Sequence, residues 1–131
     1  MADYLWTSGA TLLTMLMYFW VTLQVGLARG KYNVKAPATS GCVEFDCAFR
    51  VQQNTLEQAV WFLPSLWMFA AWQSDLWAGA LGAVWVVGRV IYAIGYNRAP
   101  EKRSVGFSIA MLANLALLLG AVGGWGMTIF G

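Results

Sequence analysis

Long apolar stretches separated by short polar ones make up most of this sequence. The stretches 4–28 and 104–130 contain no charged residue, and those at 48–72 and 76–96 contain two and one. At about 1.5 Å per helical residue, the first stretch reaches about 37 Å, enough to cross a hydrocarbon core of about 30 Å. The pattern therefore predicts four transmembrane helices with approximately these bounds.

The connections between the stretches indicate how the helices are arranged. Only the first, from Arg29 to Asp46, is long, and it is rich in turn-forming residues. The others are short, and Pro100 in the last one suits the start of the fourth helix. Since short links join antiparallel neighbours, we expect an all-α, up-and-down bundle that forms a single domain over residues 1–131.

Composition and charge favour a multi-pass membrane protein. Of the 131 residues, 60% are apolar and 11% are charged, and this charged share is about half that of a soluble protein. The formal net charge is only +2, and no basic face alternates with stacking aromatics. We therefore expect membrane lipid around the chain and no nucleic-acid partner.

The basic residues predict the orientation in the membrane. Six Lys and Arg residues lie in the first and third connections, whereas the termini and the middle connection have none. By the positive-inside rule, those two connections face the cytoplasm and both termini lie on the other side of a bacterial inner membrane or endoplasmic reticulum. The six residues are Arg29, Lys31, Lys35, Arg98, Lys102 and Arg103.

The two cysteines do not suggest a metal centre. Cys42 and Cys47 lie in the first connection, which this orientation exposes to a reducing compartment. The chain contains no histidine, so these two thiols are too few ligands for zinc. We expect neither a disulfide nor a metal site.

Polar residues inside the spans carry the functional information, because an ionisable group in lipid costs at least about 2.5 kcal/mol unless it is paired or hydrated. In 48–72 such residues recur at i, i+4 and i+7, and in 76–96 at i, i+3 and i+7, so each set shares one helix face. The sets are Arg50, Asn54 and Glu57, and Arg89, Tyr92 and Tyr96. Arg29 and Arg103 lie at the same level, where the first helix ends and the fourth begins.

Two interpretations of these residues remain open at this point. Arg29 could extend to lipid phosphate, and Arg50 or Arg89 could pair with Glu57 as structural groups. Pairing cannot neutralise four arginines with one carboxylate, however. A cationic pocket that also contains Tyr hydroxyls and the amides of Gln52 and Asn54 suits a polyanion with an ammonium group, which Glu57 would accept.

Three segments resemble the family of membrane-associated proteins in eicosanoid and glutathione metabolism (MAPEG), which includes microsomal glutathione transferases and leukotriene C4 synthase. They are FRVQQNTLE (Phe49 to Glu57), RVIYAIGY (Arg89 to Tyr96) and the basic stretch that ends at Arg103. The resemblance implies a homotrimer of four-helix subunits, with glutathione bound between neighbours.

The resemblance also assigns roles to residues of this chain. Arg103 would stabilise the glutathione thiolate, and Arg29 is the second candidate for that catalytic role. Arg29 and Gln52 would reach glutathione from the neighbouring subunit. The residues implied to bind glutathione within one subunit are Arg50, Asn54, Glu57, Tyr92 and Tyr96, with Arg89 near the same pocket.

Departures from the leukotriene C4 synthase pattern indicate a different acceptor. Gly30 replaces a second arginine at the end of the first helix, Gln58 replaces a tyrosine, and Leu115 replaces a tryptophan that clamps a lipid tail. We therefore expect a general apolar electrophile, and a lipid hydroperoxide as a further substrate. Without histidine, activation of the thiol must be electrostatic.

Other functions and packing arrangements must be weighed. A small multidrug exporter also has four helices and a membrane glutamate, but arginines around Glu57 disfavour a cationic cargo. A noncatalytic lipid-binding scaffold of the same family is the other alternative.

Small residues on the fourth helix allow close helix contact, either within a subunit or between subunits. Ala116, Gly120 and Gly124 recur every four residues.

Overall fold

The computed structural model describes residues 2–131, and this part of the chain forms four long helices. They are α1 (Leu5–Tyr32), α2 (Val43–Trp72), α3 (Asp75–Arg98) and α4 (Ser104–Phe130). Two short 3-10 helices accompany them, η1 (Ala2–Tyr4) and η2 (Pro100–Arg103). The prediction of an all-α chain with four helices is confirmed.

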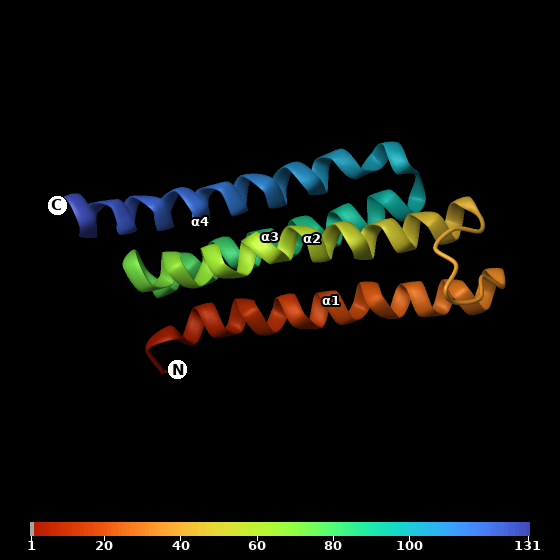
Figure 1. Ribbon diagram of the computed structural model, residues 1–131, viewed down its shortest axis with the longest axis horizontal. Helices are drawn as coiled ribbons and strands as arrows, with labels where there is room; N and C mark the ends of the chain where they lie inside the picture. The colour runs from red at the N-terminus through yellow and green to blue at the C-terminus, as the bar shows by residue number, and fades with distance from the viewer. Residues whose placement is uncertain (1) are drawn as a thin grey trace.

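The helices form an elongated up-and-down bundle. The two termini lie at one end, and the α1–α2 loop and η2 lie at the other (Figure 1). Helix α3 packs against each of the other three, while α1 and α4 lie on opposite sides of the bundle. Consequently the polar ends of all four helices meet at the end that carries the loop.

Two predicted helix bounds are wrong. Helix α1 continues to Tyr32 instead of ending near residue 28, and its C-cap, Asn33, adopts the left-handed conformation with φ of 55°. Helix α2 begins at Val43 instead of near residue 48, with Glu44 and Asp46 in its first turn, where the helix dipole favours carboxylates. Hydropathy located the apolar stretches but not the polar helical turns beyond them.

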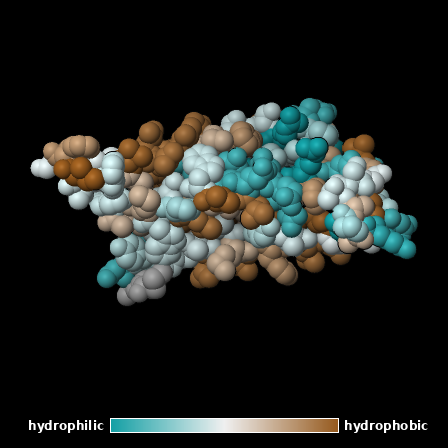
Figure 2. All heavy atoms as spheres, in the orientation of Figure 1, coloured by the Kyte–Doolittle hydropathy of each residue, from teal (hydrophilic) through white to brown (hydrophobic). Residues whose placement is uncertain are grey.

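The bundle is apolar both inside and outside. Phe62 and Trp85 stack in its interior with ring centroids 3.8 Å apart, and Leu66 and Leu117 are fully buried beside them. On the outside, leucines and other large apolar residues are widely exposed. Figure 2 shows hydrophilic residues concentrated toward the end that carries the loop.

Within residues 2–131, three helices meet the length and apolarity expected of a membrane span. They are α1, α3 and the continuous segment formed by η2 and α4. Helix α2 has 30 residues, long enough to cross a bilayer, but its polar residues keep it outside this set. The structure therefore supports three of the four predicted spans by composition.

Small residues bring α3 and α4 into backbone contact beside the polar end of the bundle. A Cβ at Gly106 would lie 2.6 Å from the Gly88 carbonyl oxygen and would also clash with the Tyr92 nitrogen. This close contact fixes Tyr92 relative to η2.

The packing of the fourth helix bears on the small residues that recur every four positions. The side chains of Phe69 and Trp72 of α2 pack against Gly120 and Gly124. Gly124 is buried and therefore packs within the subunit, whereas Gly120 is half-buried and Ala116 is exposed.

Candidate functional site

A polar cavity of about 270 Å³ lies between α2, α3 and η2 at the end of the bundle that carries the loop. Helix α2 contributes four residues that share one face at i, i+3, i+4 and i+7. Helix α3 contributes two tyrosines one turn apart, and η2 contributes its last residue. The lining residues are Arg50, Gln53, Asn54, Glu57, Tyr92, Tyr96 and Arg103. The structure thus brings together most of the residues singled out in the sequence.

Arg89 lies behind this cavity instead of lining it. Its side chain is 1% exposed, and its Nη2 donates hydrogen bonds to Asn54 Oδ1 at 2.8 Å and to Thr55 Oγ1 at 2.9 Å. Both acceptors are neutral, so the alternative in which Arg89 pairs with Glu57 is wrong. Because Asn54 Oδ1 accepts from Arg89, the amide nitrogen of Asn54 is left to donate elsewhere.

Stacking against aromatic rings further fixes the arginines. The guanidinium carbon of Arg89 lies 4.2 Å from the centre of the Tyr92 ring, and that of Arg103 lies 5.6 Å from the centre of the Tyr96 ring. The two tyrosine rings meet edge to face, with centroids 5.5 Å apart. A chain of cation and ring contacts therefore links the buried Arg89 to Arg103 at the cavity mouth.

Arg103 is held by its own turn. Its Nη1 donates to the carbonyl oxygen of Pro100 at 2.7 Å, across the short helix η2. The side chain is otherwise exposed, so the remaining guanidinium N–H groups can bind an anion in the cavity.

Arg29 and Gln52 lie away from this cavity. Arg29 Nη1 donates to the carbonyl oxygen of Ala38 at 2.7 Å, and its guanidinium carbon lies 5.0 Å from the centre of the Phe45 ring. Gln52 Nε2 donates to Thr22 Oγ1 of α1 at 3.3 Å. Within its own chain Arg29 therefore supports the α1–α2 loop and does not join the arginines near Glu57. The contact of Arg29 and Gln52 with glutathione of a neighbouring subunit stays a prediction.

Gln53 is the lining residue that the sequence reasoning missed. It follows Arg50 by three residues and precedes Glu57 by four, so helical spacing places it on the same face. The signal was present in the sequence, but Gln52 was assigned to the pocket in its place.

The cavity continues toward the α1–α2 loop. A second hollow of about 360 Å³ is lined by Thr39, Ser40, Asp46 and Phe49 and shares Arg50 and Gln53 with the first. Arg50 and Gln53 therefore border both hollows, and a ligand with charged groups at both ends could span them.

The charged residues of the cavity open to the outside of the isolated chain. Arg50, Glu57 and Arg103 are all exposed, although Arg50 and Glu57 belong to the middle of a helix in the bundle. With two cations and one carboxylate, the cavity favours a ligand that is anionic overall and has a cationic group for Glu57.

Comparison with known proteins identifies the family. The sequence matches the MAPEG family over residues 7–123. The chain belongs to the MAPEG family. Together with its three long apolar helices, this membership makes it an integral membrane protein, and the resemblance predicted from the motifs is confirmed.

Several MAPEG relatives have closely similar sequences. An uncharacterised protein of Synechocystis is 46% identical over 120 residues, 92% of this chain and 88% of that protein. Human microsomal glutathione S-transferase 2 is 38% identical over 117 residues, 88% of this chain and 80% of that protein. Rat leukotriene C4 synthase is 36% identical over 93 residues, 71% of this chain and 62% of that protein.

Proposed function

We propose that this MAPEG protein is a membrane glutathione transferase that ionises the thiol of bound glutathione and adds it to apolar electrophiles. The observation that supports this most directly is the cavity in which Arg50, Glu57 and Arg103 lie together. The name of the human relative, microsomal glutathione S-transferase 2, points to the same co-substrate.

Glutathione has the groups that such a cavity requires. It carries two carboxylates, one ammonium, two amides and a thiol. Arg50, with the Asn54 amide nitrogen beside it, would bind a carboxylate, and Glu57 would accept the ammonium. Tyr92 and Tyr96 would form the wall of the site on the side of α3, in contact with the peptide.

Arg103 is our candidate for activation of the thiol. A free thiol has a pKa near 8.5, so only a few per cent is ionised at neutral pH. A guanidinium about 4 Å away favours the thiolate by about 4 kcal/mol at an effective dielectric of about 20, before desolvation is subtracted. The thiolate then attacks an electrophilic carbon, a carbon–sulfur bond forms, and the leaving group departs with its electron pair.

We propose that the active form is a homotrimer in which a neighbour completes each site with Arg29 and Gln52. Arg50 and Glu57 are exposed on the outside of the single chain, and charged groups facing lipid are costly. A neighbouring subunit would cover them. In this assembly α2 also crosses the membrane, and its polar face is turned toward the protein.

An apolar groove supports a route for the electrophile from the lipid. It has a volume of about 420 Å³ and lies between α1 and α2, lined by Phe19, Thr22 and Leu56 among others. Thr22, which lines this groove, also accepts the hydrogen bond from Gln52. Because we place Gln52 at the glutathione of the neighbouring subunit, the groove leads from the lipid toward that glutathione.

The test is turnover by the purified protein with glutathione and a generic aryl halide, and separately with a lipid hydroperoxide. Arg50→Ala and Arg103→Ala are expected to lower kcat/KM at least tenfold, whereas Arg98→Ala removes an exposed arginine outside the cavity and should have little effect. Wild-type protein that binds glutathione without turnover would favour the noncatalytic scaffold. Full activity in a monodisperse monomer would contradict the trimer.

A further inference from the structure

A further polar cavity, separate from the two hollows described above, lies at the same end of the bundle, on the opposite side of α2. It has a volume of about 230 Å³ and lies between the end of α1, the start of α2 and the end of α3. Ala48 lines it, whereas Arg50 lines the proposed glutathione site, and two residues correspond to about 200° of rotation around a helix. The two cavities share no residue.

The cavity lies where the apolar surface of α1 ends. Leu23 and Leu27 are 47% and 63% exposed, and one turn after Leu27 comes Lys31. On α3, Ile94 is 44% exposed and Asn97 follows within a turn. In a membrane, such a change from exposed apolar to charged side chains marks the level of the lipid headgroups.

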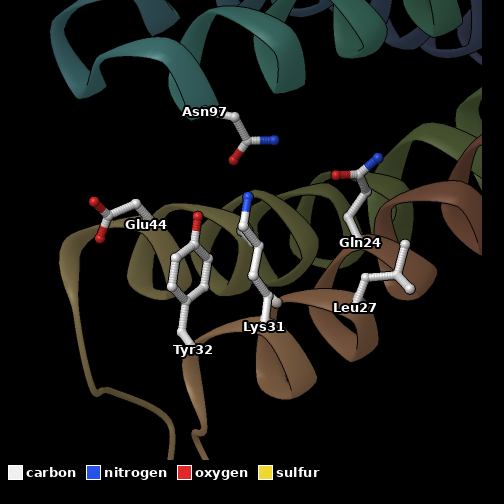
Figure 3. A pocket seen from close by; sticks show the side chains of 8 residues that line it. Gln24, Leu27, Lys31, Tyr32, Glu44 and Asn97 are labelled. Carbon is white, nitrogen blue, oxygen red and sulfur yellow. The ribbon is translucent and has the colours of Figure 1, made fainter.

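The polar groups of the cavity are divided by charge (Figure 3). The ammonium of Lys31 points into the space between the amides of Gln24 and Asn97. The carboxylate of Glu44 lies on the far side of Tyr32 and points away from Lys31. One part of the cavity therefore holds a positive charge between two amides, whose oxygens face the ammonium, and the edge of the cavity holds a negative charge.

We propose that this cavity binds the headgroup of a membrane phospholipid that carries a phosphate and a primary ammonium, as phosphatidylethanolamine does. The phosphate oxygens accept hydrogen bonds from Lys31 and, once the two amide groups rotate to present their nitrogens, from Gln24 and Asn97. The ammonium donates to the Glu44 carboxylate. The acyl chains extend along the exposed Leu27 and Leu23 into the bilayer.

The site should select an ethanolamine headgroup, because the Glu44 carboxylate needs a cationic group with N–H donors. A choline headgroup carries the same positive charge but has no N–H to donate, and a glycerol headgroup has no cation to pair with Glu44. Cationic pockets between helices at the cytoplasmic face are a known way of holding anionic headgroups, but here Lys31 and Glu44 together balance the charge of a zwitterion.

The experiment is native mass spectrometry of the purified protein titrated with phosphatidylethanolamine, phosphatidylcholine and phosphatidylglycerol of equal chain length. Wild-type protein should bind the ethanolamine lipid most tightly. Lys31→Gln should weaken all three lipids by about tenfold, the value of one charge-assisted hydrogen bond. Glu44→Gln should abolish the preference for ethanolamine over choline.

Matched controls remove the same charges outside the cavity. Lys35→Gln and Glu101→Gln should leave lipid binding unchanged, and all four variants should keep the helical circular dichroism of the wild type. Equal binding of the three lipids, or equal losses in the control variants, would overturn the proposal. Release of the bound lipid by an equal concentration of soluble phosphoethanolamine would show that the site recognises a free headgroup compound and not a lipid.

Discussion

The least expected residue is Arg89, a cation buried among helices with neutral hydrogen-bond partners. Burial of a charge is costly unless its N–H groups are satisfied. Here Asn54 and Thr55 supply acceptors for Nη2 only, and the buried Nε has no hydrogen-bond partner. In return, the bond fixes which end of the Asn54 amide faces the cavity. Arg89 is therefore a positioning residue, and Asn54 a hydrogen-bond donor, in the proposed site.

This role predicts a specific kinetic effect. Arg89→Met removes the guanidinium, leaves Asn54 free to rotate, and should raise the KM for glutathione about tenfold with a smaller change in kcat, as expected when ground-state binding is lost. Arg89→Lys, which can still donate to one acceptor, should restore part of the affinity. Steady-state kinetics on the purified variants measure both constants.

Thr55→Val is the matched control, since it removes the other acceptor of Arg89 and leaves the bond to Asn54. Its KM should stay within about threefold of the wild-type value, the effect of a neutral hydrogen bond. An Arg89→Met variant with normal KM would show that Asn54 needs no such support.

At the scale of helices, the contact between α3 and α4 determines the position of Tyr92 and η2. Gly106→Ala would insert a methyl group against the Gly88 carbonyl oxygen and the Tyr92 nitrogen, and overpacking of this kind costs about 1–3 kcal/mol. We expect a thermal midpoint in detergent lower by at least about 3 °C and a higher KM for glutathione.

Gly123→Ala tests the same substitution on α4 where a Cβ would meet nothing within 4 Å. It should leave both the midpoint and the KM unchanged, or raise the midpoint slightly through helix propensity. Equal losses in the two variants would indicate that α4 is sensitive to alanine in general and not to the contact with α3.

The elements were more predictable from the sequence than their exact ends and partners. Uncharged stretches define helices in lipid because every backbone group must bond within its own segment, and helical spacing grouped Arg50, Asn54 and Glu57 correctly. The spacing does not reveal how far a polar end continues as helix. The resemblance places Arg29 and Gln52 at the site of a neighbouring subunit, and that placement stays a prediction. Gln53, which lines the cavity of its own chain, was overlooked.

For the whole molecule, the distribution of basic residues predicts that the α1–α2 loop and η2 face the cytoplasm, where reduced glutathione is abundant. With Cys42 and Cys47 replaced by Ser, single cysteines at Lys35→Cys and Lys102→Cys should not react with an impermeant thiol reagent in intact cells. Asp3→Cys, at the opposite end of the bundle, should react. The reverse labelling pattern would contradict the proposed orientation.

The central claim is that this cavity ionises glutathione and that Arg103 supplies the stabilising charge. The most direct measurement is the ultraviolet thiolate absorbance of the purified protein at saturating glutathione, read together with kcat. Wild-type protein and Arg50→Ala, once saturated, should both show the thiolate. Arg103→Ala should lose it and turn over about 30-fold to 150-fold more slowly, equivalent to about 2–3 kcal/mol of lost charge stabilisation. A normal thiolate signal and kcat in Arg103→Ala would contradict the assignment and make Arg29 of a neighbouring subunit the next candidate.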